Sequence, residues 1–409
     1  MRASSSGGPE KGVRAITRWI GLDCHTTSVT VAILEEGSKK ARHRRFDNTE
    51  AAWAGFCREE VNVATHLVLE ASGGAWPIYD RLNSAGAAEI LVAHPLRVKA
   101  IAAARVKSDR VDARTLAELG RAGLIPAVWV PSPQERTLRT LVRRRVSVAR
   151  VATGQKNQVC AALRRQGIRA AKPRLFTDEG QRFLAQLVLP RGEDVIVAGA
   201  QNLLQWCEVQ QTALEAEIAA IVRDGEPAFR ADVQRLMTVP GVDLLTAVAT
   251  RARLGDVRRF RNGRFAAAYI GLTPRVRQSG ATQRTGAITK QGDRVLRALL
   301  CQAAWATVRS GSRFRRRFEH LCARKGPKIA IVAIARRLLM LLFTLLRTQT
   351  PYQAARPSNV RQKEKRLARL PRSYWDAFHQ AHPVMVNRAR PQQGTTAIRT
   401  SRRPAAMVT

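Results

Sequence analysis

Residues 18–34 read RWIGLDCHTTSVTVAIL, and apolar side chains alternate with other side chains on both sides of the polar stretch HTTS. This alternation predicts a β-hairpin, because neighbouring side chains of a strand point to opposite faces. Short apolar runs and helical stretches follow, which indicates an α/β domain with a mixed sheet and helices on its faces. The elements predicted after the hairpin are a strand at 41–46, buried strands at 66–70 and 89–95, and helices near 50–60 and 74–85.

The composition is that of a large basic protein with a core. The chain has 409 residues, of which 45% are hydrophobic. At roughly 150 residues per domain, this length predicts two or three domains. Lys and Arg number 70 against 31 Asp and Glu, which gives a formal net charge of +39. A charge of this size favours nucleic acid as the partner, and an acidic membrane surface is the alternative.

Signals for export, membrane insertion and disulfides are weak. The longest apolar run, at 329–346, contains Arg336 and Arg337 and is short for a bilayer span, so it predicts a buried or partner-facing helix. The first residues, MRASSSGGPEKG, contain no apolar segment like that of a secretory signal. Six cysteines are scattered without a CxxC pair, which disfavours a zinc site or a disulfide framework. We therefore expect a cytoplasmic protein without a membrane partner.

Strand signals fade in the middle of the chain, and the expected organisation follows from this. Apolar residues near heptad spacing at 203–222 fit a coiled coil to a second subunit, and hence a homo-oligomer, as well as a helical hairpin within one chain. The ends lack sustained periodicity, which predicts flexible segments. The predicted organisation is a flexible N-terminus at 1–15, an α/β domain at 16–133, a helical linker or coiled coil at 134–225, a mostly α domain at 226–350 and a basic flexible tail at 351–409.

Four carboxylates are notable in so basic a chain. Asp109 and Asp112 are three positions apart in KSDRVDARTLAEL, so on a helix they share the apolar face of Ala113. Carboxylates that point inward cost on the order of several kcal/mol unless something pairs them, and a bound cation is one such partner. Asp23 lies on the first predicted strand, and Glu70 ends a later one.

These carboxylates converge if the first and fourth strands are neighbours in the sheet. Two divalent cations about 4 Å apart need such a cluster to act on a phosphodiester, and hard oxygen ligands select Mg²⁺ or Mn²⁺. Each residue also has a structural alternative. Asp23 would end a strand and Glu70 would begin a turn, while Asp109 would be a helix N-cap and Asp112 would interact with the helix dipole.

Two segments of the second half suggest phosphate binding. LMTVPGVDLLTAV at 236–248 is similar to a helix–hairpin–helix turn, whose backbone N–H groups grip a phosphate. Asp243 stands where a second glycine is usual, and a purely structural turn is the alternative. The segment at 269–297 is dense in Gly, Ser, Thr and basic residues. Its candidate phosphate-binding side chains are Arg275, Arg277, Arg284 and Lys290, and a solvated basic loop is the alternative.

Taken together, GLDCHTTSVTVAIL with Asp23, LVLEASGG with Glu70 and the paired aspartates Asp109 and Asp112 resemble the DEDD transposases of the Piv and IS110 insertion-sequence group. The resemblance extends from residue 16 to about residue 345 and includes the segment from GLTP to GDRVLR. It implies a ribonuclease-H-type, RuvC-like first domain and a catalytic serine in the second domain, which corresponds to Ser279.

For function, the resemblance implies a DNA transposase or site-specific recombinase. Such an enzyme would cut and rejoin strands of DNA with carboxylate-bound Mg²⁺ and Ser279. The resemblance also implies a structured guide RNA, and with it an enzyme that works at the nucleoid. A serine hydroxyl is a weak nucleophile until neighbouring groups activate it, and the arginines of its segment could supply such a field.

Three other functions stay open at this point. A RuvC-like structure-specific nuclease would need the four carboxylates but no serine. A non-catalytic nucleic-acid-binding protein would use the aspartates only to cap helices. GLDCHTT also resembles the phosphate loop of sugar kinases, although His25 stands where those enzymes have glycine and no later DxG phosphate loop is found.

Overall fold

The computed structural model describes residues 16–102, 108–169, 171–279, 282–311 and 313–381. The chain divides into two compact units between Val130 and Pro131, and each unit is described by itself. The predicted flexible N-terminus at 1–15 lies outside the described residues, as does the end of the predicted tail at 382–409.

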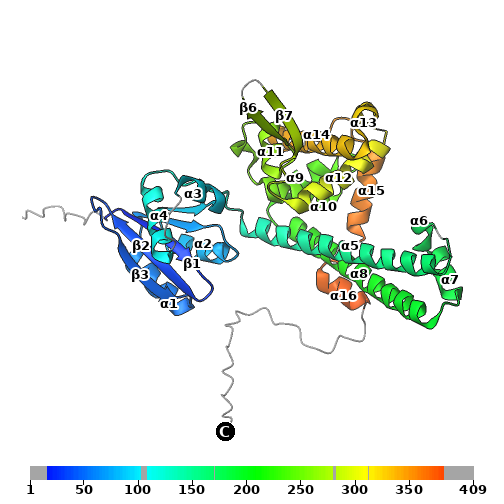
Figure 1. Cartoon of the computed structure of the whole chain (residues 1–409), viewed down its shortest axis with the longest axis horizontal. Coiled ribbons are helices and arrows are strands. Elements are labelled where there is room, and N and C mark those ends of the chain that lie inside the picture. Colours follow the sequence, from blue (N-terminus) through cyan, green and yellow to red (C-terminus); the bar gives the residue numbers. More distant parts are fainter. Residues whose placement is uncertain (1–15, 103–107, 170, 280–281, 312, 382–409) are drawn as a thin grey trace, which may run out of the picture. The chain divides into compact units, whose positions relative to one another are not determined.

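The first unit contains a five-stranded mixed sheet with the order β3-β2-β1-β4-β5 (Figure 1). Its strands are β1 (Arg18–Cys24), β2 (Ser28–Glu35), β3 (Arg42–Asp47), β4 (Thr65–Glu70) and β5 (Glu89–Ala93). The pairs β1–β2 and β2–β3 are antiparallel, whereas β1–β4 and β4–β5 are parallel. All five strands and the mixed sheet were predicted from the sequence, and the structure confirms them.

Helices cover both faces of this sheet. They are α1 (Glu50–Glu60), α2 (Ala75–Ser84), α3 (Pro95–Ile101) and α4 (Asp109–Arg121). The face with Ile20 and Leu22 packs with Trp53 and Phe56 of α1 in one core cluster. The opposite face carries Gly21, and α4 packs against it. The alternation of the strand sequence therefore separates the two packed faces.

The second unit begins with two long helices that lie side by side, α5 (Pro133–Arg165) and α8 (Arg191–Asp224), as Figure 1 shows. Two short helices, α6 (Lys172–Leu175) and α7 (Asp178–Gln186), join them. A capping box of Ser132 and Glu135 starts α5. Within the chain, α5 and α8 form the helical hairpin that was one of the two alternatives. The coiled coil to a second subunit stays a prediction.

The remainder of the second unit is helical apart from one β-hairpin. Its elements are α9 (Pro227–Met237), α10 (Leu244–Leu254), the 3-10 helix η1 (Val257–Arg259), α11 (Gly263–Ile270), β6 (Pro274–Ser279), β7 (Thr282–Ile288), α12 (Arg294–Arg309), α13 (Arg313–Lys325) and α14 (Pro327–Thr348). Among the described residues, α14 alone is long and apolar enough to cross a membrane, with a mean hydropathy of 2.3. However, 56% of its most apolar window is buried inside the protein, and Leu338, Leu339 and Leu342 are fully buried. This burial fits a core helix.

The sequence predicts a flexible tail from residue 351, whereas the structure has two helices there, α15 (Pro357–Ala368) and α16 (Tyr374–Ala381). Tyr374 explains how α16 is held, because its backbone N–H donates to Glu217 and its hydroxyl donates to Gln210 Oε1 at 3.0 Å. Both acceptors belong to α8. The prediction of flexibility was wrong for these residues because distant contacts, rather than local periodicity, hold the helices.

Candidate metal centre and basic hairpin

Two of the four predicted carboxylates lie at the same end of the first unit's sheet. β1 and β4 are parallel neighbours, and Leu22 lies opposite Leu69. The next residues along the two strands are Asp23 and Glu70. Because side chains alternate, both point to the face opposite the two leucines, which is the face that α4 covers. The neighbouring position of the two strands, on which the predicted convergence depended, is therefore confirmed.

Helix α4 brings the paired aspartates to this sheet end. Ser108 is the N-cap, with its side chain accepting from Val111 N, so Asp109 and Asp112 both lie in the first turn. The alternative in which Asp109 is the N-cap was therefore wrong. A methyl group on Gly21 would lie 2.0 Å from the Ala113 carbonyl oxygen, so only glycine lets the helix backbone approach β1 this closely.

A histidine that the sequence analysis did not select joins the two aspartates. His25 Nε2 lies 3.3 Å from Asp23 Oδ2 and 3.5 Å from Asp109 Oδ1. Among the described residues, these three form the group whose candidate ligand atoms lie within 4.8 Å of one another. The available signal was position, because His25 follows the strand-end aspartate by two residues, at the start of the β1–β2 turn.

The charges of the aspartates in this group are only partly offset by His25. Partial burial raises the pKa of Asp23, and the charges of Asp109 and Asp112 raise it further, while His25 opposes these effects. Burial also raises the pKa of the Cys24 thiol to about 12, so Cys24 stays protonated at neutral pH and does not act as a thiolate ligand.

The structure does not bring all four carboxylates equally close. Asp112 is near enough for its charge to act on Asp23, although it lies outside the group within 4.8 Å. Glu70 is exposed at the end of the neighbouring strand and is also outside that group. The converging donors are carboxylate oxygens and one imidazole. This donor set fits a hard divalent cation such as Mg²⁺ or Mn²⁺.

In the second unit, the basic segment at 269–297 forms a β-hairpin where the alternative was a solvated loop. β6 and β7 are antiparallel, with Ser279 opposite Thr282 at the end of the hairpin. Arg277 lies opposite Arg284, so the backbone places two cationic residues side by side across the strands. Arg275 Nη2 donates to the Thr289 carbonyl at 3.4 Å, and Lys290 follows at the base with a left-handed φ of 57°.

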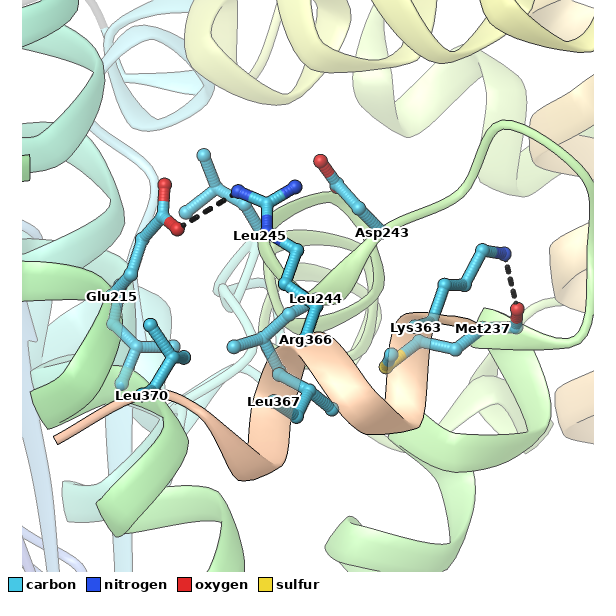
Figure 2. Close-up of a pocket in the computed structure, with 10 residues that line it drawn as sticks. Glu215, Met237, Asp243, Leu244, Leu245, Lys363, Arg366, Leu367 and Leu370 are labelled. Atoms are coloured by element: carbon cyan, nitrogen blue, oxygen red, sulfur yellow. Dashed lines mark hydrogen bonds and ion pairs between the residues drawn. The ribbon is translucent and has the colours of Figure 1, made fainter. Parts of the chain in front are cut away.

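The turn between α9 and α10 is held by hydrogen bonds within the second unit. Lys363 of α15 donates to the carbonyl groups of Met237 and Val239, and Figure 2 shows its side chain reaching toward Met237. Asp243 caps α10 by accepting from Thr246 N at 3.0 Å. A carboxylate at this helix N-terminus repels phosphate, so these contacts favour the structural-turn alternative over a phosphate grip.

Comparison with known proteins gives matches in both units. Residues 20–167 match a transposase family of the IS110 DEDD type, and residues 233–319 match the family described as "Transposase IS116/IS110/IS902 family". The "Probable family 20 transposase" of Pseudomonas aeruginosa is 32% identical over 300 residues, which cover 70% of this chain and 85% of that protein.

Two further relatives carry functional names. The "Transposase for insertion sequence element IS1111A" of Coxiella burnetii is 28% identical over 295 residues, covering 70% of this chain and 79% of the relative. The "Pilin gene-inverting protein" of Moraxella lacunata is 26% identical over 297 residues, covering 70% of this chain and 81% of the relative.

Proposed function

The chain belongs to the IS116/IS110/IS902 transposase family, and from this premise we propose that it cuts and rejoins DNA with two separate groups of side chains. The enzyme is a transposase or recombinase, and its relatives are named for moving an insertion sequence and for inverting a gene segment. The observation that supports the proposal most is the approach of Asp23 and Asp109 at one end of the sheet.

The first group is the carboxylate cluster of the first unit. Asp23 and Asp109 would hold a divalent cation, with Asp112 and Glu70 as the further ligands that the family resemblance assigns. A bound Mg²⁺ or Mn²⁺ would stabilise charge on the phosphate oxygens. His25 Nε2 lies 3.3 Å from an oxygen of Asp23 and 3.5 Å from an oxygen of Asp109, so His25 would be a third ligand of that cation.

The second group is the basic hairpin of the second unit. Arg275, Arg277, Arg284 and Lys290 would bind the phosphates that flank the scissile bond, because guanidinium groups match phosphate oxygens. Ser279 would attack the phosphorus atom through Oγ. The hydroxyl loses its proton as the Oγ–P bond forms, the P–O bond to the leaving deoxyribose breaks, and that oxygen takes up a proton. The phosphate end of the DNA strand is left as an ester of the serine. Attack by a second strand's hydroxyl would reverse this step and rejoin the DNA without ATP.

Three further features belong to the proposal: a guide RNA, an oligomeric state and a location in the cell. A structured guide RNA would pair with donor and target DNA, and the net charge of +39 supports binding to it. A homo-oligomer would bring two strands of DNA together, and the protein would act in the cytoplasm at the nucleoid.

A carboxylate exchange tests the metal centre. Asp23→Asn and Asp109→Asn should each lower recombination between element ends and target by about 100-fold or more, because a ligand and a charge are lost together. Glu36→Gln is the matched control, since Glu36 is an exposed carboxylate of the same unit. Near-normal recombination by a folded Asp23→Asn protein would contradict the assignment.

A nicked suicide substrate tests the serine. After denaturation and protease digestion, a DNA-linked peptide that contains Ser279 is expected from the unmodified protein and not from Ser279→Ala. The control is Thr282→Ala, which changes the hydroxyl residue opposite Ser279 on the other strand. Efficient cleavage by Ser279→Ala, with protein-free ends, would instead favour a metal-dependent structure-specific nuclease.

A further inference from the structure

A hollow of about 890 Å³ in the second unit is lined by arginines of three helices. Arg264 comes from α11, Arg313 and Arg317 come from α13, and Arg336 and Arg337 come from α14. These five residues are called the arginine groove. They are separate from the hairpin residues to which the proposed function assigns phosphate binding.

The groove is extended by a second hollow of about 500 Å³, which shares Arg313, Leu341 and Thr344 with the first. The second hollow adds Arg356 and Asn359 at the start of α15. Among the described residues, neither hollow is lined by an aspartate or a glutamate. The combined surface therefore offers cationic and neutral donors along a continuous path, as a chain of phosphates requires.

The charges of the groove arginines are not matched by carboxylates of the described residues. Within the part of the chain that the structure describes, no carboxylate forms an ion pair with any of the five, and Arg336 Nε is buried without a hydrogen-bond partner. By contrast, the partly buried Arg251 of this unit lies 2.7 Å from Asp232 and 2.9 Å from Glu135. Five guanidinium groups without a described carboxylate beside them leave positive charge that an external anion can neutralise.

The lining also contains apolar surface between the arginines. Leu321, Met340 and Leu341 line the same hollow, and Phe314 beside them is almost fully buried. A duplex presents its phosphates outward and keeps its bases stacked, so it makes little use of a concave apolar surface. An unpaired strand can place a base there while arginines contact its backbone.

We propose that the arginine groove binds a single-stranded segment of nucleic acid, with the arginines on its phosphates and the apolar residues against an unstacked base. The proposal extends the proposed function to a site outside the hairpin. Binding is measured without cleavage, so the test of this proposal does not depend on the metal centre or on Ser279.

The test uses fluorescence anisotropy of the full chain with labelled oligouridine RNA, oligothymidine DNA and duplex DNA, each about 15 nucleotides long. The groove variant is Arg317→Gln/Arg337→Gln, which changes two exposed residues. The control is Arg316→Gln/Arg324→Gln, which removes the same charge from exposed positions of α13 outside the groove. Unchanged thermal unfolding of both variants shows that they are folded.

The groove variant should bind at least one of the single strands about tenfold more weakly. Its dependence of log K on log salt should be shallower by about 1.4, because each lost phosphate contact with a single strand contributes about 0.7. The control should stay within about twofold of the unmodified protein. A larger loss for RNA than for DNA identifies RNA as the occupant, and the reverse identifies DNA. Equal losses in the two variants, no loss in either, or an equal loss for duplex DNA would overturn the proposal.

Discussion

The two units of this protein place charge in opposite ways. In the first unit, Asp23 and Asp109 are brought together at the end of a buried sheet, where partial burial and mutual repulsion raise the pKa of Asp23. In the second unit, arginines lie on the exposed hairpin and in the groove, while the partly buried Arg251 is matched by carboxylates. The charge of Asp23 is thus disfavoured in the folded first unit, whereas positive charges of the second unit are paired, as in Arg251, or left without a carboxylate among the described residues, as in the arginine groove.

The difference indicates what each region needs for its proposed role. Holding a cation requires two oxygens at fixed positions, so the carboxylates are attached to packed backbone that cannot shift easily. Binding phosphates requires only long cationic side chains that can adapt, so an exposed hairpin is sufficient. If this comparison is right, small backbone changes should damage the first region far more than the second.

The largest effect is expected from Gly21→Ala. Its methyl group would collide with the Ala113 carbonyl and the Ala117 nitrogen, at 2.0 and 2.6 Å, so α4 has to move away from β1. Overpacking of this kind costs about 1–3 kcal/mol, and the displaced aspartates should abolish detectable recombination. Thermal unfolding and a recombination assay measure the two effects.

Gly55→Ala is the control for this substitution, because the added methyl group would meet only the Glu59 side chain, at 3.9 Å. This change within α1 should leave recombination intact and stability equal or higher. Full recombination by Gly21→Ala would show that the carboxylates do not depend on the close packing of α4 on β1.

The first unit was largely predictable because its elements are encoded locally. Alternation in 18–34 identified β1 and β2, and the spacing of Asp109 and Asp112 placed them on the apolar face of α4. The approach of Asp23 to Asp109 also follows from strand order and helix face. His25 was missed because a polar residue in a turn gives no periodic signal, and its position between the aspartates depends on tertiary packing.

The second unit was less predictable because distant contacts decide its local structure. The strands of the β6–β7 hairpin read PRVRQS and TQRTGAI, which are mostly polar and lack apolar alternation, so no strand was predicted there. Helices α15 and α16 have the composition of a flexible tail, yet Lys363 and Tyr374 bond to residues more than 100 positions away. The arginine groove likewise combines residues of α11, α13 and α14, and no short sequence pattern indicates that these helices lie together.

A smaller effect is expected from Asp23→Asn in unfolding experiments, where the variant should be the more stable protein without Mg²⁺ and the less stable one with Mg²⁺. Because the pKa of Asp23 is raised above 3.8 in the folded state, its charge lowers stability at neutral pH, and stability recovers as pH falls through the raised pKa. Without a divalent cation, Asp23→Asn should therefore unfold at a higher temperature than the unmodified protein at pH 7.

Addition of Mg²⁺ should reverse this order. At about 100 times its Kd, the cation stabilises the unmodified protein by about 2.7 kcal/mol, whereas the variant lacks a ligand and gains little. Differential scanning calorimetry with EDTA and with Mg²⁺ measures both states, and Glu36→Gln is again the control. An equal response of the two proteins to Mg²⁺ would remove Asp23 from the metal centre.

The smallest effect concerns Lys363, a partly buried cation of the second unit whose ammonium group donates to the carbonyl groups of Met237 and Val239. Burial lowers the pKa of Lys363 to about 8, although the charge of Asp243 opposes this shift. Below pH 8, Lys363 is therefore charged in the folded protein, and burial of this charge lowers the stability of the fold. Between pH 8 and the ordinary lysine value of 10.5, the folded protein has lost this proton while the unfolded chain still binds it.

Stability should accordingly rise with pH across this window, and it should do so only where Lys363 is present. The neutral amine keeps two N–H groups, enough for the carbonyls of Met237 and Val239, so the contacts survive deprotonation. Urea midpoints of the unmodified protein and of Lys363→Met should diverge in favour of the former from pH 8 to pH 10. Lys365→Met, an exposed change on the same helix, controls for the loss of one lysine. A constant difference between the midpoints would mean that Asp243 keeps Lys363 charged, and that a buried cation here is paired like Arg251.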